Sequence, residues 1–230
     1  MLSDKEFEKL QNAIHYCYSV PFIDDVEDFI FESIWSYVKG ISIDNPLSRT
    51  KKLFDVVDSK NKIGWSAKTL VLNSRTAQEC EFVIQRADVF KKGSELGFPG
   101  LTENSKPQEI GNAVLEHWYQ KVELDSASQE VKDRRLVLLL KNDKRTDFQI
   151  IEEKLSVPKH KDLIWNWTND SHLGLQATRK SDNFVIFRWY RNQKQLFERI
   201  KISREVPPFS IDPKRISPES IIENFMKSHL

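Results

Sequence analysis

The chain has 230 residues, of which 39% are hydrophobic and 30% are charged, so we expect a soluble globule of one large domain or a domain with an extension. No apolar run approaches the roughly 20 residues that cross a bilayer, and the N-terminus MLSDKEFEKL lacks the apolar core of a signal peptide. A cytoplasmic protein with no membrane partner is therefore expected, while the formal net charge of +1 neither supports nor excludes a nucleic-acid substrate.

The first forty residues predict two helices. Ser3 and Glu6 form a capping box in front of an apolar stripe that Pro21 ends. The spacing of apolar residues predicts a second helix from about 25 to 39. In the loop that follows, the ISI segment at 41–43 is the best candidate for a short first strand.

Residues 53–72 predict a β-hairpin with the four-residue loop SKNK. This register puts Asp55 opposite Ser66, where directly opposed Cβ atoms lie about 5 Å apart. Because side chains alternate along a strand, Asp55, Ser66 and Lys68 should share one face and one small volume.

A helix is expected after the hairpin, from about 76 to 90, and a second helix from about 108 to 122. The five-residue apolar run LVLLL at 136–140 then predicts a buried strand. A strand that follows a helical crossover usually pairs in parallel, so LVLLL should lie beside the second hairpin strand.

Strands dominate the chain from residue 147 onward. The segments DFQIIEEKL, DLIWNWTND, LGLQATR, NFVIFRWYR and QLFERIKIS are separated in part by turn signals and predict an antiparallel meander. A short helix from about 217 to 226 should end the chain. We therefore expect an N-terminal helix (1–24), a core (25–145) and a β-rich part continuous with it (146–230).

Asp55, ten intervening residues and Ser66-Ala67-Lys68 resemble the active-site hairpin of the PD-(D/E)xK nucleases, the superfamily of most type II restriction endonucleases. Phe54 stands where the family often has proline, and Ser66 where it usually has Asp or Glu. The predicted element order between about 25 and 140 is similar to the αβββαβ core of that family. The resemblance implies an α/β (α+β) fold with a restriction-endonuclease-like mixed central sheet flanked by helices, and here a C-terminal antiparallel β-rich extension.

The resemblance also implies an activity: sequence-specific endonuclease cleavage of double-stranded DNA with Mg²⁺, by a homodimer as in a restriction-modification system. Asp55 would be the anchoring metal ligand, the carbonyl of Ala67 a further ligand, and Lys68 would polarise the attacking water or neutralise the phosphate. Ser66 would complete the catalytic hairpin. A non-specific or repair-type nuclease of the same superfamily and a non-catalytic DNA-binding module remain alternatives.

Four further acids compete for roles in such a site. Some restriction enzymes with Ser-x-Lys supply the missing carboxylate from the following helix, which makes Glu79 and Glu81 candidates. Glu79 can close a capping box, so we prefer Glu81 as the catalytic and metal-binding residue. Asp58 is an alternative anchor to Asp55, although it suits the hairpin turn. Glu32 on the second helix resembles an auxiliary acid of these nucleases or is a solvated helix residue.

The β-rich part holds the expected DNA-reading surface, in which Arg can read guanine and Gln or Asn can read adenine. The alternative is a polar hairpin tip. The residues expected on this surface are Gln176, Arg179, Arg188, Arg191, Asn192, Gln193 and Lys194.

Other chemistries lack their motifs. The two cysteines, Cys17 and Cys80, have no metal-ligand spacing and should be buried free thiols. The five histidines do not cluster. The absence of a glycine-rich phosphate loop and of a Gly-x-Ser-x-Gly elbow argues against a nucleoside triphosphatase and an α/β-hydrolase.

Overall fold

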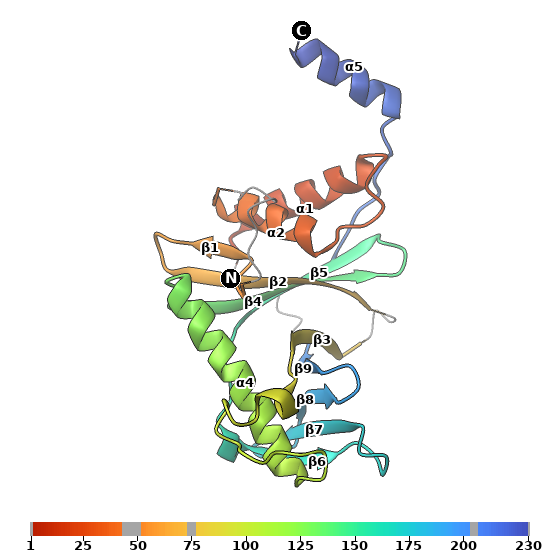
Figure 1. Ribbon diagram of the computed structural model, residues 1–230. Coiled ribbons are helices and arrows are strands. Elements are labelled where there is room, and N and C mark those ends of the chain that lie inside the picture. Colours follow the sequence, from red (N-terminus) through yellow and green to blue (C-terminus); the bar gives the residue numbers. More distant parts are fainter. Residues whose placement is uncertain (1, 43–51, 73–76, 203–206, 230) are drawn as a thin grey trace. The chain divides into compact units, whose positions relative to one another are not determined.

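The chain forms a mixed α+β protein with two sheets. The computed structural model describes residues 2–42, 52–72, 77–202 and 207–229. These residues form two five-stranded sheets and five α-helices (Figure 1). Two compact units result, and each is assembled from separate stretches of chain. The first unit comprises residues 1–76, 129–154 and 203–230, and the second unit comprises residues 77–128 and 155–202.

The first unit carries the predicted hairpin. Its sheet has the strand order β1-β2-β4-β5-β10, with β2 and β4 parallel and the other neighbours antiparallel. The predicted pairing of LVLLL beside the second hairpin strand is thus confirmed. The elements are α1 (Asp4–Ser19), α2 (Asp28–Lys39), β1 (Val56–Asp58), β2 (Ile63–Leu72), β4 (Asp133–Asn142), β5 (Asp147–Lys154), β10 (Phe209–Ser210) and α5 (Pro218–His229).

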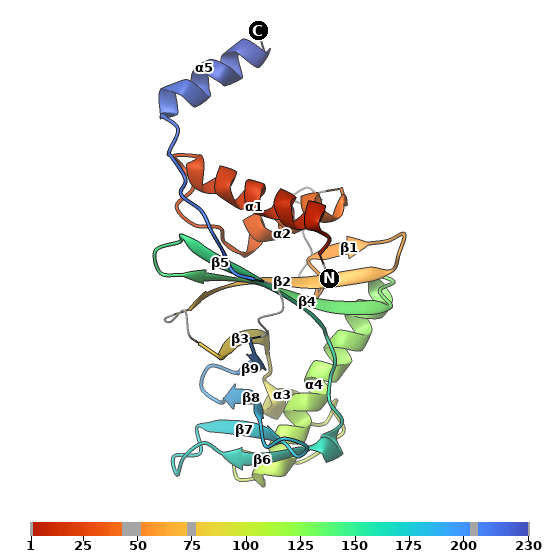
Figure 2. The same cartoon turned by 180° about the vertical axis from the view of Figure 1, so that it is seen from behind.

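Helices α1 and α2 cover one face of this sheet (Figures 1 and 2). The predicted capping box begins α1, because the Ser3 hydroxyl accepts from the Glu6 N–H and Glu6 accepts from the Ser3 N–H. Trp35 of α2 and Trp65 of β2 meet edge to face in the core, with ring centroids 6.4 Å apart. The sequence suggests a short strand at 41–43. Ile41 and Ser42 belong to no strand, and Ile43 lies outside the described residues.

The second unit is built on an antiparallel sheet with the strand order β3-β9-β8-β7-β6. The predicted meander is confirmed for its last four strands, while DFQIIEEKL instead forms β5 and pairs with β4 in the first sheet. The elements are β3 (Glu79–Arg86), α3 (Val89–Lys92), α4 (Pro107–Ser128), the 3₁₀ turn η2 (His160–Asp162), β6 (Leu163–Trp167), β7 (Gly174–Arg179), β8 (Val185–Tyr190) and β9 (Gln195–Lys201).

The helix predicted from about 76 to 90 is wrong, because its central part is strand β3. Cys80 and Phe82 are buried and alternate with the more accessible Glu79, Glu81 and Val83, which is the period of a strand. Strand β3 pairs with β9, more than 100 residues away in the chain. A partner so distant in sequence overrides local propensity and also explains why the compact units differ from the linear division expected from the sequence.

Helix α4 packs against this second sheet at a glycine. A Cβ at Gly111 would lie 2.1 Å from the Trp165 ring, so only glycine permits the observed approach. The helix extends the predicted range of 108–122 at its C-terminal end. Neither α4 nor any other helix in the described ranges is long and apolar enough to cross a membrane.

Candidate active site

The hairpin places Asp55 at the edge of β2. Asp58 pairs with Ile63 and Val56 with Trp65, which is the register predicted from the sequence. Just before β1, the Asp55 N–H donates to the Trp65 carbonyl at 2.9 Å. Within the described residues β1 pairs with β2 only as far as Trp65, so the continuation of this edge has no strand partner.

Two carboxylates occupy this unpaired edge. The Ala67 N–H donates to Asp55 Oδ2 at 2.9 Å. Two residues further along, the Thr69 N–H donates to Asp28 Oδ1 at 2.7 Å and the Thr69 hydroxyl donates to the same oxygen at 2.9 Å. Alternate residues of a strand present their N–H and C=O groups to the same edge. The Ala67 carbonyl therefore emerges between the two carboxylates.

The Lys68 ammonium lies at the same edge of β2. Its Nζ donates to the Ala67 carbonyl at 3.0 Å and lies 3.4 Å from Asp55 Oδ2. The Lys68 and Asp55 side chains are 28% and 18% exposed, so the pair is partly shielded from water but open to a ligand. The predicted proximity of Asp55 and Lys68 is confirmed.

The electrostatic balance of Asp55 is unusual for a paired acid. Burial raises the pKa of the Asp55 carboxyl, and the charge of Lys68 and the Ala67 N–H only partly offset that effect. The charge of Asp28 raises the pKa of Asp55 further. The site thus holds more negative charge than Lys68 compensates.

Two contacts hold Asp55 in position. The side-chain amide of Gln129 accepts from the Phe54 N–H at 3.3 Å and donates to the Phe54 carbonyl at 2.8 Å. The Phe54 ring is buried and packs over Gly64, where a Cβ would lie 2.7 Å from the ring. Phe54 directly precedes Asp55, so its buried ring and its two backbone hydrogen bonds fix the chain at the start of Asp55. Phe54 stands where PD-(D/E)xK nucleases, which this hairpin resembles, often have proline.

The donor set suits a hard divalent cation. Two carboxylates and one backbone carbonyl are the oxygen ligands that Mg²⁺ accepts, with water completing the shell. In the described part of the chain no group of three or more Asp, Glu, His or Cys side chains gathers in a way that could hold a metal ion. The fit therefore rests on Asp28, Asp55 and the Ala67 carbonyl together.

Asp28 was missed by sequence reasoning, which chose Glu32 from the same helix. Asp28 is the first residue of α2, and Glu32 lies one turn further along and is half-buried. An acid in the first turn of a helix is ordinary, because it complements the helix dipole. Only the docking of α2 on the sheet brings Asp28 to Thr69.

The other predicted catalytic acids have different surroundings. Asp58 caps the hairpin turn, accepting from the N–H groups of Lys60 and Asn61 and from the Asn61 amide, and those hydrogen bonds lower the pKa of Asp58. Glu81 lies on β3 in the second unit and accepts from Arg188 Nη1 at 3.2 Å, and Glu79 pairs with Arg199. The helix that was expected to present Glu81 is not formed.

Ser66 is buried in β2. It is 5% exposed and lies in register with Leu136 of the parallel strand β4. Its neighbours along the strand, Trp65 and Ala67, belong to the core beneath α1 and α2, so Ser66 faces away from that core. Lys68 is two residues further along β2 and therefore lies on the same face as Ser66, as the sequence predicts.

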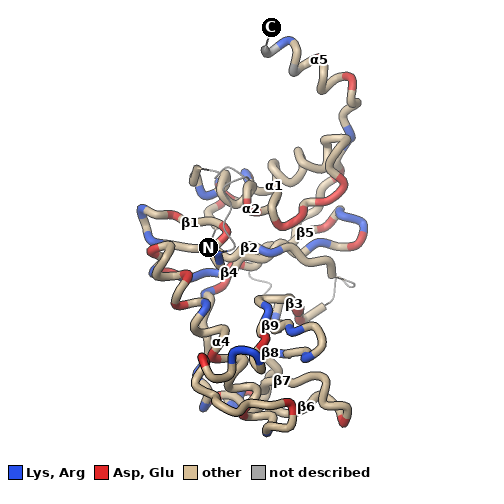
Figure 3. Tube along the Cα trace, viewed as in Figure 1, with Lys and Arg blue, Asp and Glu red and all other residues tan. Residues whose placement is uncertain are grey.

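The expected DNA-reading residues separate into two groups. Gln176 and Arg188 are cross-strand partners on one face of the second sheet. The others lie in turns or at a strand end, where Arg179 pairs with Asp182, Arg191 with Glu103 and Lys194 with Asp88, while Asn192 and Gln193 are exposed. Basic and acidic residues are accordingly interspersed over the elements of the second unit (Figure 3).

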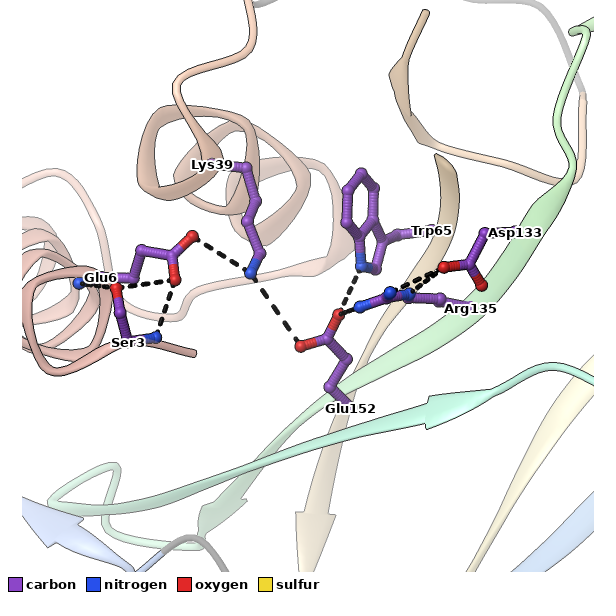
Figure 4. Close-up of polar contacts among 7 residues, drawn as sticks. All are labelled: Ser3, Glu6, Lys39, Trp65, Asp133, Arg135 and Glu152. Carbon is purple, nitrogen blue, oxygen red and sulfur yellow. Dashed lines mark hydrogen bonds and ion pairs between the residues drawn. The ribbon is translucent and has the colours of Figure 1, made fainter. Parts of the chain in front are cut away.

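A second polar cluster of the first unit is centred on Glu152 of β5 (Figure 4). Glu152 Oε1 accepts from Trp65 Nε1 and from Arg135 Nη1, both at 2.8 Å, and Lys39 Nζ lies 4.0 Å from Oε2. Arg135 also pairs with Asp133, and Lys39 with Glu6. Among the described residues, each charged side chain of the cluster has an ionic partner, so the cluster ties α1 and α2 to the sheet.

Comparisons of the chain with protein-family models, with curated proteins and with solved structures find no match.

Proposed function

We propose that the first unit hydrolyses phosphodiester bonds of double-stranded DNA with Mg²⁺, in the manner of a sequence-specific type II restriction endonuclease. The observation that carries the proposal is the edge of β2 that has no strand partner among the described residues, where Asp55, Asp28 and the Ala67 carbonyl lie beside the Lys68 ammonium. An ion pair between Asp55 and Lys68 that served only stability would need neither Asp28 nor the Ala67 carbonyl beside it.

The residues divide the chemistry among them. Asp55 and Asp28, with the Ala67 carbonyl, hold the cation. When bound, Mg²⁺ supplies Lewis-acid stabilisation of the negative charge that develops on the phosphate. Lys68 neutralises a phosphate oxygen or orients the attacking water, and its hydrogen bond to Ala67 keeps the ammonium at this edge.

The topology around the site supports the same proposal. An antiparallel hairpin whose second strand pairs in parallel with a later strand is the arrangement that the resemblance to the PD-(D/E)xK core implies. Helix α2 precedes the hairpin and brings its acid to the site, as the first core helix does in that family. The crossover between β2 and β4 includes residues 77–128 of the second unit, with β3, α3 and α4, so it is larger than a single helix.

We assign DNA recognition to one face of the second sheet. Gln176 pairs with Asn166 on one side and with Arg188 on the other, and Arg188 pairs in turn with Phe197. This row presents two side-chain amides, one guanidinium and one aromatic ring across four strands, which are groups that read base edges or stack on bases. The Arg188 guanidinium pairs with Glu81 and would leave that pair to reach a base. Arg188→Ala should weaken binding to the preferred sequence about 10- to 100-fold.

A cleavage assay tests the proposal. Supercoiled plasmid and mixed-sequence linear DNA are incubated with the protein and Mg²⁺, with a chelator control and an Asp55→Asn variant. Discrete fragments that require Mg²⁺ and Asp55 support the restriction-type activity, and smearing or nicking indicates a non-specific or repair-type nuclease. Intact DNA with a gel shift indicates a non-catalytic binding module, and intact DNA without a shift overturns the proposal.

A further inference from the structure

The first turn of α2 depends on other elements for its position. The helix begins at Asp28, which accepts from the N–H and the hydroxyl of Thr69 on β2. The residue before it, Glu27, is the N-cap and makes no capping hydrogen bond with its side chain. A helix that starts without a side-chain cap lacks the usual local contact that fixes its first turn. The position of Asp28 therefore depends on what holds the chain just upstream of it.

Val26, two residues before Asp28, is held through both of its backbone groups. The Val26 carbonyl accepts from Lys141 Nζ at 2.7 Å, and the Val26 N–H donates to the Tyr18 hydroxyl at 3.2 Å. The Val26 side chain is itself fully buried in the core beneath α1 and α2. Backbone and side chain together leave this residue little freedom to move.

The lysine in this clamp is a buried cation. The Lys141 side chain is 3% exposed, and its Nζ lies 2.6 Å from Asp25 Oδ1. Asp25 also pairs with Arg145 at 3.2 Å and accepts from the Tyr18 hydroxyl at 2.9 Å. Burial would raise the pKa of Asp25, but the hydrogen bonds from Lys141 and Tyr18 and the two cations outweigh burial and lower that pKa. Buried ion pairs often add little net stability over apolar residues of similar size, so stability alone does not account for Lys141.

Lys141 lies close to the strand residue that holds Asp28. Thr69 of β2 is in register with Leu139 of β4, and Lys141 is two residues beyond Leu139. Leu139 belongs to the core beneath α1 and α2, so Lys141 points to the same face of the sheet. Two residues of a strand span about 7 Å. The start of α2 thus has two neighbouring anchors on the first sheet, one on β4 and one on β2.

We propose that Lys141 is a positioning residue of the candidate site, because its ammonium holds the chain before α2 on β4 and thereby keeps Asp28 at the edge of β2. The inference rests on the proposed function only for the role of Asp28 as a metal ligand. Lys141 acts through Val26 and needs no contact with the cation or the DNA. Removal of such supporting contacts typically lowers metal affinity or activity about 10- to 100-fold.

Hydrogen exchange of two backbone amides tests the position of Asp28 without any cleavage. In Lys141→Met, the Thr69 amide should exchange at least about 10-fold faster relative to the Ala67 amide. The acceptor Asp28 would leave the first amide, while Asp55 would still hold the second. A general loss of stability speeds the exchange of both amides, so their ratio reports the local change.

Metal binding and turnover show whether that position matters. Lys141→Met should raise the Ca²⁺ dissociation constant and lower kcat for DNA cleavage, each about 10- to 100-fold, with KM for DNA unchanged. Lys39→Met breaks ion pairs at the other end of α2 and is the matched control. It should lower stability and leave the exchange ratio, the Ca²⁺ affinity and kcat at wild-type values. A Lys141 that served only stability would behave in the same way as Lys39.

A second variant covers the case in which Lys141→Met does not fold. Lys141→Gln keeps a polar group beside Asp25, but its shorter side chain loses the Val26 carbonyl, so it should shift the exchange ratio in the same direction. Circular dichroism and urea unfolding verify that each variant is folded.

The outcomes separate this inference from the proposed function. An unchanged exchange ratio in the folded Lys141 variant overturns the inference, and so does a raised ratio with wild-type Ca²⁺ affinity and kcat. A raised ratio with weaker Ca²⁺ binding supports it. If the wild-type protein neither binds Ca²⁺ nor cuts DNA, the proposed function fails, while a raised ratio still supports the placement of Asp28 by Lys141.

Discussion

Asp28 and Asp55 accept hydrogen bonds from the backbone N–H groups of Thr69 and Ala67, two residues apart on one edge of β2. The two acids come from different elements, the first turn of α2 and the segment before β1. An unpaired strand edge exposes N–H groups that need acceptors, and here carboxylates satisfy them. The same hydrogen bonds fix two anionic groups on either side of the Ala67 carbonyl.

Asp28→Asn should lower the DNA cleavage rate by about 100-fold or more, because it removes one anionic ligand while keeping an acceptor for the Thr69 N–H. Ca²⁺ affinity, measured by calorimetry on the same protein, should fall as well. Glu32→Gln, one turn further along α2, is the matched control and should have little effect. Equal losses in the two variants would remove Asp28 from the site.

Lys68→Ala should leave DNA binding intact and abolish cutting, because the ammonium acts on the phosphate or the attacking water and not on duplex recognition. Gel-shift affinity in Ca²⁺ and single-turnover cleavage in Mg²⁺ separate the two effects. Lys60→Ala removes an exposed lysine from the hairpin loop and serves as the control. Full activity of Lys68→Ala would exclude Lys68 from the mechanism.

Glu152→Gln should reduce the free energy of unfolding by about 2–4 kcal/mol at pH 7, since it leaves Arg135 and Lys39 without their shared buried carboxylate. Burial alone would raise the pKa of Glu152, but the hydrogen bonds from Trp65 and Arg135 and the charge of Lys39 outweigh burial and lower that pKa.

The sign of the pH dependence follows from that lowered pKa. The contribution of Glu152 is fully present above its unfolded pKa of about 4.3 and is lost as the pH falls through the folded value. Urea unfolding of wild type and Glu152→Gln between pH 7 and pH 3 should therefore converge at the acidic end. A difference that stays constant with pH would contradict the ionic role.

Gly111→Ala should destabilise the second unit by about 1–3 kcal/mol, because the new methyl group meets the Trp165 ring. Helix propensity alone predicts the opposite sign, a gain of about 1 kcal/mol. Thermal unfolding decides between packing and propensity. In a Trp165→Leu background the same substitution should be less harmful, and an undiminished effect would place the clash elsewhere.

The hairpin and its neighbours were predictable because their determinants are local. The turn chemistry of the SKNK loop sets the register of β1 against β2, and strand alternation then assigns Asp55 and Lys68 to one volume. The capping box of α1 and the apolar run of β4 are local in the same sense.

Three features depended on partners distant in sequence, and only the tertiary structure decided them. Residues 79–86 became a strand because β9 supplies a pairing edge more than 100 residues away. Glu81 forms an ion pair with Arg188 of the same sheet. Asp28 lies at the candidate site only because α2 packs on the first sheet. By itself the sequence determined the local hairpin and two of its charged groups. The tertiary structure selected the second acid, because side-chain convergence depends on packing between elements that no local pattern encodes.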